Sequence, residues 1–259
     1  MGLQVVIGQL EIGWDPRRNS ERIISFLQAE ARPGSLAVLP EAALSGYDDQ
    51  LSGLDRLDRR ALADGLTAVA AAARELHVNV LCGSLLPEAG SWWNVAIYFG
   101  PAGERWMYRK VNLANHERGR LAAGADLPLL QLAKPSVAIG VQLCRELKYP
   151  EQWHVLARGG ARLLVYLTYA ANPRIPPGVW RSHLVSRAAE TQRFVLAANA
   201  ADPDQHCPSM VITPRGEVVA EAATSAPCVL HAELDLAEVS DLVLSQQRED
   251  VVGISYPAR

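Results

Sequence analysis

The stretch that decides the fold is VAIGVQLCRELKYPEQWHVLARGGARLLVYL, residues 137–167. It opens with the apolar run Val137–Leu143, which stops at a cysteine, and it closes with the apolar run Leu163–Leu167. Between them, Pro150 suits the first turn of a helix and Gly159-Gly160 suits its end. Continuous apolar strands joined by a helix indicate an α/β protein whose sheets are covered by helices.

The same alternation extends to both ends of the chain. Near the N-terminus, Leu3–Gln9 and Leu36–Leu39 are predicted strands, and Ser20–Ala31 is a predicted helix capped by Asn19 or Ser20. Late strands joined by short turns favour mixed sheets, so we predict sheets inside and helices outside. The other predicted elements are helices over Asp58–Leu76 and Gly178–Thr191, and strands over Val78–Leu85, Asn94–Phe99, Trp106–Tyr108, Phe194–Ala198, Met210–Ile212, Val218–Ala220 and Val229–Leu234.

Composition narrows the class of protein. The 259 residues are 49% hydrophobic and 20% charged, which is typical of a globular protein, and no linker divides them, so we expect a single domain over residues 1–259. A formal charge of −3 gives no reason to expect nucleic acid or an anionic membrane as a partner. With no signal peptide and no membrane-spanning run recognisable, we expect a cytoplasmic protein.

Metal and cofactor sites are not indicated. The four cysteines form no CxxC pair, the six histidines are dispersed, and no HExxH motif occurs. No GxSxG elbow for a serine nucleophile occurs either. We therefore expect a site that uses neither a metal nor a cofactor.

Three chemically reactive side chains follow three of the predicted strands. Glu41 follows Leu36–Leu39 and a proline, Lys110 follows Trp106–Tyr108, and Cys144 follows the strand quoted above. In open α/β sheets, reactive groups lie just beyond the carboxyl ends of strands. A carboxylate, an amine and a thiol together suffice for amide hydrolysis, since they supply a general base and acid, an oxyanion donor and a nucleophile. The backbone N–H of Arg145 is a second candidate oxyanion donor.

Each residue also has an ordinary structural interpretation. Glu41 could cap or pair at the surface, Lys110 could be a solvated charge, and Cys144 could be a buried core thiol. Strand-end placement by itself does not separate these interpretations from catalysis.

The sequences around these three residues favour the catalytic interpretation. The segments LPEAALSGY at 39–47, YRKVNL at 108–113 and LCRELKYPE at 143–151 resemble, in order, the three catalytic motifs of the nitrilase (carbon–nitrogen hydrolase) superfamily. The resemblance covers nearly the whole chain, with further matches that include Asn94, Glu117 and Gly124, the helix and strand at 180–199, and Ser209, Pro214 and Gly216.

The resemblance implies a fold, a mechanism and an assembly. The fold would be a four-layer αββα sandwich with two mixed sheets face to face. Glu41 would be the general base and acid, Lys110 would stabilise the oxyanion, and Cys144 would be the nucleophile. Glu117 matches a further active-site Glu that positions the substrate and the Lys. Members of this superfamily typically form homodimers or larger homo-oligomers.

Two positions after the nucleophile depart from the superfamily pattern. Many members have an aromatic residue and then Asp, whereas this chain has Arg145 and Glu146, so a carboxylate is kept and the aromatic side chain is lost. We expect Tyr47, Arg145, Tyr169 and Ala170 to contact the substrate, and a guanidinium such as that of Arg145 suits a substrate carboxylate.

The preferred function is hydrolysis of a small linear amide through a thioester, with ammonia or an amine released. An N-carbamoyl amide hydrolase or a true nitrilase is an alternative of the same class, and a catalytically silent scaffold is an alternative of another class. In an active enzyme we expect a low-pKa Cys144 that reacts with iodoacetamide faster than the other three cysteines do.

Overall fold

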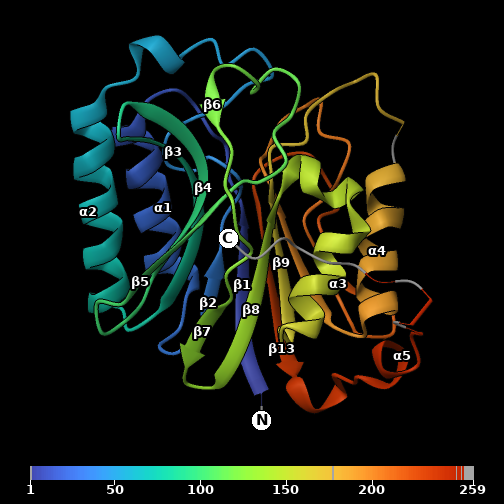
Figure 1. Cartoon of the computed structure of the whole chain (residues 1–259). Coiled ribbons are helices and arrows are strands. Elements are labelled where there is room, and N and C mark those ends of the chain that lie inside the picture. Colours follow the sequence, from blue (N-terminus) through green and yellow to red (C-terminus); the bar gives the residue numbers. More distant parts are fainter. Residues whose placement is uncertain (1, 177, 249, 252, 254–259) are drawn as a thin grey trace.

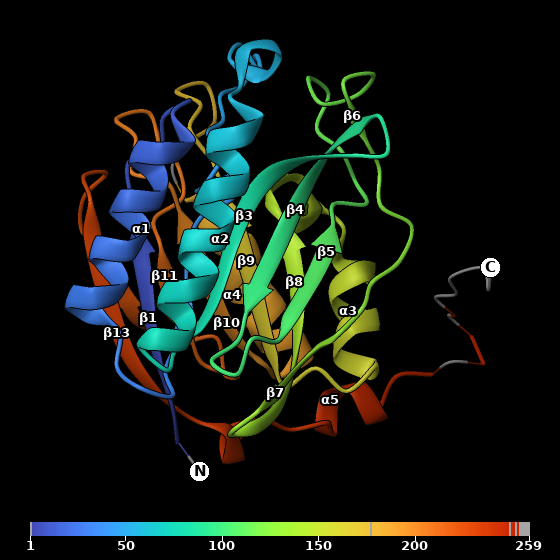
Figure 2. The ribbon, with the colours of Figure 1, turned by 90° about the vertical axis from the view of Figure 1, so that its left-hand side faces the viewer.

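Two mixed β-sheets lie face to face, with helices on the outer side of each (Figure 1). This computed structural model describes residues 2–176, 178–248, 250–251 and 253. The layers run helix, sheet, sheet, helix, and the view turned by 90° shows α1 and α2 covering the outer face of one sheet (Figure 2). The predicted four-layer α/β arrangement is confirmed.

The first sheet belongs mainly to the N-terminal half of the chain. Its strand order is β13-β1-β2-β3-β4-β5, with β6 paired to β4. The strands β1, β2 and β3 are mutually parallel, and the remaining pairs along this order are antiparallel. The bounds are β1 (Gly2–Gln9), β2 (Leu36–Val38), β3 (Asn79–Glu88), β4 (Ser91–Phe99), β5 (Arg105–Arg109), β6 (Leu121–Ala122) and β13 (Cys228–Asp235), with helices α1 (Pro16–Glu30) and α2 (Arg59–Glu75) outside.

The second sheet has the strand order β12-β11-β10-β9-β8-β7. Its central strands β8, β9 and β10 are parallel, and both edges are antiparallel. The bounds are β7 (Leu130–Ala133), β8 (Ser136–Leu143), β9 (Leu163–Thr168), β10 (Phe194–Asn199), β11 (Met210–Ile212) and β12 (Val218–Glu221), with helices α3 (Pro150–Arg158) and α4 (Val179–Thr191) outside and the short helix α5 (Leu242–Ser245) towards the C-terminus.

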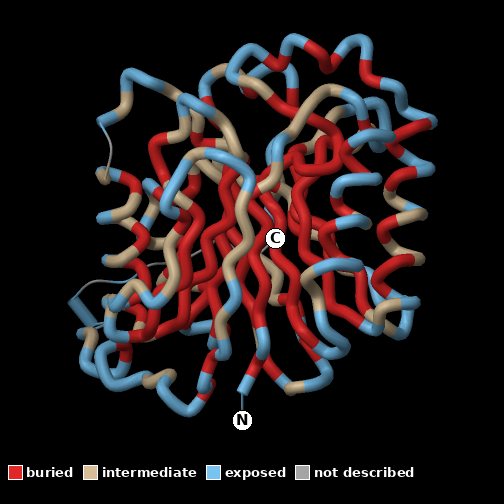
Figure 3. The backbone as a smooth tube through the Cα atoms, turned by 180° about the vertical axis from the view of Figure 1, so that it is seen from behind, coloured by how far each residue is buried: buried red, intermediate tan, exposed pale blue. Residues whose placement is uncertain are grey.

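Alternate side chains of each central strand enter different cores. On β1, Val5 and Ile7 pack between the two sheets, whereas Val6 packs under α1 and α2. On β9, Val165 faces the other sheet and Tyr166 faces α3 and α4. Because successive strand residues point to opposite faces, a strand buried on both faces is apolar throughout, which is the pattern seen in the sequence. Figure 3 shows this continuous burial along the strands.

One predicted helix start is wrong, and three short elements were not predicted. Helix α1 begins at Pro16 rather than at Ser20, because the Asp15 side chain caps it by accepting bonds from the backbone N–H groups of Arg17 and Arg18. Asn19 is instead buried and bonds to loop backbone. The short elements β6, β7 and α5 were not predicted, since two to four residues are too few for a period to be recognised.

Within the described residues, no helix is both long enough and apolar enough to cross a membrane.

Candidate active site

A buried ammonium joins two buried carboxylates. The Lys110 Nζ donates to Glu41 Oε1 at 2.8 Å and to Glu117 Oε1 at 3.0 Å, and all three side chains are fully buried. Glu41 lies three residues beyond the end of β2, Lys110 directly after β5, and Glu117 in the loop that follows. Residues 69 positions apart in the sequence are therefore brought into direct contact.

Asn94 completes this cluster, and sequence reasoning gave it no role. Its Nδ2 donates to Glu41 Oε1 at 2.8 Å and to Glu117 Oε1 at 2.6 Å, and its backbone carbonyl accepts from Lys110 N at 2.9 Å. The signal was an amide in the middle of an otherwise apolar strand, since a buried polar side chain requires hydrogen-bond partners.

Close backbone packing holds Glu41 in place. Its Oε2 accepts from the backbone N–H of Tyr169 at 2.9 Å, so the carboxylate also bonds to the end of the second sheet. A Cβ added at Gly83 on β3 would lie 2.5 Å from Glu41 Cα, which no real contact allows. Glycine at this position therefore lets β3 pack directly against the Glu41 backbone.

Cys144 occupies a strained turn at the end of β8. Its φ is 39°, in the left-handed region that non-glycine residues rarely adopt, and the 3₁₀ turn η2 (Cys144–Lys148) starts there. Its carbonyl accepts from the Tyr166 hydroxyl at 2.8 Å. Such strain costs about 1–3 kcal/mol and clusters at functional sites, where it fixes the direction of a side chain.

The charges around Cys144 determine its protonation. Burial raises its pKa and so does Glu41, while Lys110 opposes them, and the result is about 12. Burial acts to lower the pKa of Lys110, but Glu117 and Glu41 outweigh it and raise that pKa above its ordinary value. Burial acts to raise the pKa of Glu117, but Lys110 and hydrogen bonds lower it. Since two carboxylates already exceed one ammonium, a thiolate would add a second uncompensated negative charge.

The resting site therefore holds a thiol beside a carboxylate. The prediction of a low-pKa Cys144 is wrong for the site without substrate, because it counted the attraction of Lys110 and not the burial and the repulsion by Glu41.

This protonation state predicts the pH dependence of labelling. A small neutral reagent that is not an amide, such as methyl methanethiosulfonate, should modify Cys144 at a rate that keeps rising between pH 7 and pH 9. Below a pKa of about 12 the thiolate fraction grows about tenfold per pH unit. Mass spectrometry of the labelled peptide measures the rate, and the half-buried Cys228 is an internal comparison. A rate that levels off below pH 8 would contradict the thiol assignment.

Two of the four predicted substrate contacts, Tyr47 and Tyr169, lie against the cluster. The Tyr47 hydroxyl donates to Glu117 Oε1 at 2.8 Å, and its ring lies 5.7 Å from that of Tyr169, measured between centroids. The Tyr169 backbone holds Glu41, and Ala170 N donates to Asn199 Oδ1 at 2.8 Å. Arg145 is half-buried, and its side chain has no hydrogen bond or ion pair with any residue that the structure describes.

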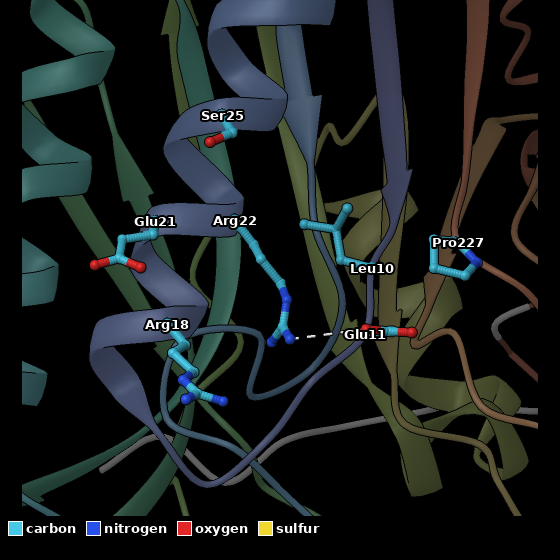
Figure 4. Close-up of a pocket in the computed structure, with 7 residues that line it drawn as sticks. All are labelled: Leu10, Glu11, Arg18, Glu21, Arg22, Ser25 and Pro227. Atoms are coloured by element: carbon cyan, nitrogen blue, oxygen red, sulfur yellow. Dashed lines mark ion pairs between the residues drawn. The ribbon is translucent and has the colours of Figure 1, made fainter.

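A surface depression beside α1 is a different feature (Figure 4). It encloses about 550 Å³ and is lined by charged side chains, among them Glu11 and Arg22, whose Oε2 and Nη2 lie 3.7 Å apart. It contains no cysteine and none of the clustered residues Glu41, Lys110 and Glu117. The chemistry therefore belongs to the buried cluster and not to this depression.

No group of three or more His, Cys, Asp or Glu side chains arranged to hold a metal ion occurs in the described part of the chain.

Comparison with known proteins identifies the family. The model of the carbon-nitrogen hydrolase family matches residues 4–242, which is nearly the whole chain. The chain belongs to the carbon-nitrogen hydrolase family. The resemblance seen in the three sequence motifs is confirmed, and with it the assignment to a family of enzymes that act on amides.

Two similar proteins match most of the chain. Human omega-amidase NIT2 is 26% identical over 268 residues, which cover 95% of each protein. The 2-oxoglutaramate amidase of Bacillus subtilis is 28% identical and covers 88% of each.

Among solved structures, an amidase from Nesterenkonia superimposes with a TM-score of 0.80 at 20% identity, covering 96% of this chain and 94% of that one. Nit3 of Saccharomyces cerevisiae has a TM-score of 0.77 at 23% identity, covering 98% of this chain and 96% of that one. At these identities the likeness supports the fold.

Proposed function

We propose that this carbon-nitrogen hydrolase cleaves small linear amides through a thioester on Cys144, with Glu41 as general base and acid and Lys110 as oxyanion donor. The observation that carries the proposal is the contact of Lys110 with Glu41 in a fully buried cluster whose charges act on a strained Cys144. A neutral amide group suits the reacting position, because the net negative charge of the cluster disfavours further negative charge there.

In the first half-reaction the Cys144 thiol proton moves to Glu41 as the sulfur attacks the amide carbon. Glu41 Oε1 already accepts from Lys110 and Asn94, so Oε2, with the Tyr169 N–H as its donor, has more capacity to accept the proton. The carbonyl oxygen gains the negative charge. An ammonium has three N–H donors and Lys110 uses two of them on Glu41 and Glu117, so one remains for that oxygen, together with the Arg145 N–H.

Collapse of the tetrahedral intermediate breaks the carbon–nitrogen bond, and the protonated Glu41 returns the proton to the leaving nitrogen. A water molecule then attacks the thioester while Glu41 accepts a proton from it. The carboxylic acid product leaves, and the proton returns from Glu41 to the Cys144 sulfur. Over the whole cycle, each proton that Glu41 accepts is released again, and the proposed steps need no cofactor.

Glu117 serves this proposal by holding Lys110. Its Oε1 accepts from Lys110, Asn94 and Tyr47, and its Oε2 accepts from Ala114 N at 2.6 Å. A carboxylate with this many donors is fixed in position, so it directs the ammonium and does not exchange protons during turnover.

The relatives and one side chain support a more specific substrate class. Relatives carry the names omega-amidase and 2-oxoglutaramate amidase, which describe monoamides of dicarboxylic acids. We propose that Arg145, which is half-buried and pairs with no side chain in the described part of the chain, binds the distal carboxylate of such an amide, with Tyr47 and Tyr169 along the substrate chain and the Ala170 backbone beside them.

A substrate panel with ammonia detection tests the function. Wild-type protein and the Cys144→Ala variant would be given succinamate, butyramide, a ureido acid and an aliphatic nitrile. We expect ammonia from the amides, with succinamate preferred, and none from the variant. Preference for the ureido acid or the nitrile would indicate the alternative activities of this family. No turnover of any compound would favour the catalytically silent scaffold.

Three further proposals are a single domain over residues 1–259, a homodimer or larger homo-oligomer, and a cytoplasmic location. The second of these rests on the family resemblance. The core between the two sheets supports the first, since it contains residues from Leu3 to Leu236. Multi-angle light scattering of the purified protein tests the second.

A further inference from the structure

Glu146, two residues after Cys144, is a fully buried carboxylate with four hydrogen-bond donors. Its Oε1 accepts from the Tyr108 hydroxyl at 2.6 Å and from the backbone N–H groups of Val111 at 2.8 Å and Asn112 at 3.0 Å. Its Oε2 accepts from Leu143 N at 2.8 Å.

These donors flank the two candidate catalytic residues. Tyr108 is on β5 of the first sheet, and Val111 and Asn112 come directly after Lys110. Leu143 ends β8 of the second sheet and directly precedes Cys144. One carboxylate therefore bonds, through different oxygens, to the backbone beside Lys110 and to the backbone beside Cys144.

The Glu146 backbone is itself fixed from the helical layer. Its carbonyl accepts from Trp153 Nε1 on α3 at 3.1 Å, and the next carbonyl, that of Leu147, accepts from Arg187 Nη2 on α4 at 3.1 Å. Both donors are buried. The carboxylate therefore acts from a rigid support, which is a condition for setting a distance between other groups.

We infer that Glu146 is a positioning residue, which sets the spacing between the Lys110 ammonium and the Cys144 sulfur across the two sheets. The inference deepens the proposed function and rests on it, because the spacing matters only if these two groups share a reaction. Displacements of about 1 Å in a catalytic site cost about 100-fold in rate, so a link of this kind is expected to act on kcat.

Because the two carboxylate oxygens of Glu146 bond to different sides of the site, one substitution can break one link and keep the other. In Glu146→Gln, one oxygen becomes an NH₂ group, which cannot accept. The amide oxygen should stay where three donors converge, and the NH₂ group should then face the Leu143 N–H. The link to the Lys110 side is kept, whereas the link to the Cys144 side is lost.

The first measurement is steady-state kinetics with the best amide of the panel. We expect Glu146→Gln to lower kcat by about 100-fold with KM changed less than threefold. The conservative Glu146→Asp keeps the charge but is shorter, and its kcat should lie between those of Glu146→Gln and the wild type. Glu221→Gln is the matched control, because Glu221 is a half-buried carboxylate on β12 that pairs with Arg181 and contacts neither Trp153 nor Arg187 in the described structure, and it should leave kcat unchanged.

The second measurement does not need turnover. If Lys110 and Cys144 separate, the sulfur loses a stabilising charge, so methyl methanethiosulfonate should label Cys144 about tenfold more slowly at pH 9, the effect of one pKa unit. Labelling of Cys228 should not change. A purely structural role would lower the folded fraction and leave both the kcat per folded site and the labelling rate at wild-type values.

The outcomes separate the two proposals. If wild-type protein hydrolyses nothing, the proposed function fails, and the labelling rates still decide the role of Glu146. If Glu146→Gln has wild-type kcat and wild-type labelling, the positioning role is overturned. If that variant does not fold, Glu146→Asp decides, and wild-type values for both of its rates would overturn the inference.

Discussion

Replacement of Cys144 by alanine is expected to lower amide hydrolysis by about 10⁵-fold or more, since removing the nucleophile of a concerted set costs about as much as removing the whole set. The fold should persist. Alanine has the same backbone cost at a φ of 39° as cysteine has, and the substitution removes only one sulfur atom. The free energy of unfolding should therefore change by about 1 kcal/mol or less.

Ammonia release and urea denaturation measure the two effects. Cys228→Ala is the matched control, because Cys228 is a half-buried thiol on β13 outside the charged cluster, and it should retain full activity. Hydrolysis by Cys144→Ala at more than a few per cent of the wild-type rate would end the thioester mechanism.

Replacement of Lys110 by methionine is expected to affect both rate and stability. The amide hydrolysis rate should fall by several orders of magnitude because the oxyanion loses its charged donor. Glu41 and Glu117 would remain buried without their cation, and removing one partner of a buried ion pair costs about 3–5 kcal/mol. Among single substitutions at this site, we expect this one to destabilise the fold most.

The destabilisation should shrink as the pH falls. In the wild type, the lowered pKa of Glu117 contributes stability above the ordinary carboxyl pKa, and this contribution is lost as the pH falls through the folded-state value. In Lys110→Met, burial without a cation raises the pKa values of the carboxyl groups. The free energy of unfolding of this variant is therefore reduced most at high pH, where the buried carboxyl groups must ionise. Denaturation at pH 7 and pH 5 should therefore give a smaller difference at pH 5.

A second substitution supplies the control for this effect. The double variant Lys110→Met with Glu117→Gln removes one of the two buried carboxylates that have lost their cation. It should therefore recover part of the stability that Lys110→Met loses, while its activity stays low. Equal stability of Lys110→Met and the wild type at pH 7 would contradict the buried ion pair.

Most of the fold could be predicted from local sequence patterns, and the wrong predictions concern one helix start and short elements. Central strands such as β8 and β9 are buried on both faces, which leaves an unbroken apolar run in the sequence. The start of α1 was predicted wrongly because several polar residues near it can cap a helix. In the structure the Asn19 side chain bonds to loop backbone, and the Asp15 side chain caps the helix. The edge strand β7 depends on its partner β8 for its conformation.

For the candidate site too, local sequence predicts some residues and misses others. Glu41, Lys110 and Cys144 are predicted as site residues because reactive side chains at strand ends and motif resemblance point to the same positions. Asn94 and Glu146 were recognised in motifs but given no catalytic role, because their importance lies in contacts with residues 23 to 53 positions away. No local pattern contains that information.

The sequence by itself determined which residues stand at the ends of strands and which family the chain resembles, because both depend on side-chain identity and short-range periodicity. Only the tertiary structure decided that Glu41, Lys110 and Glu117 share one buried cluster, and that Cys144 rests as a thiol. The physical reason is that a pKa depends on burial and on the sum of surrounding charges. Here those charges come from two sheets and from loops far apart in the chain.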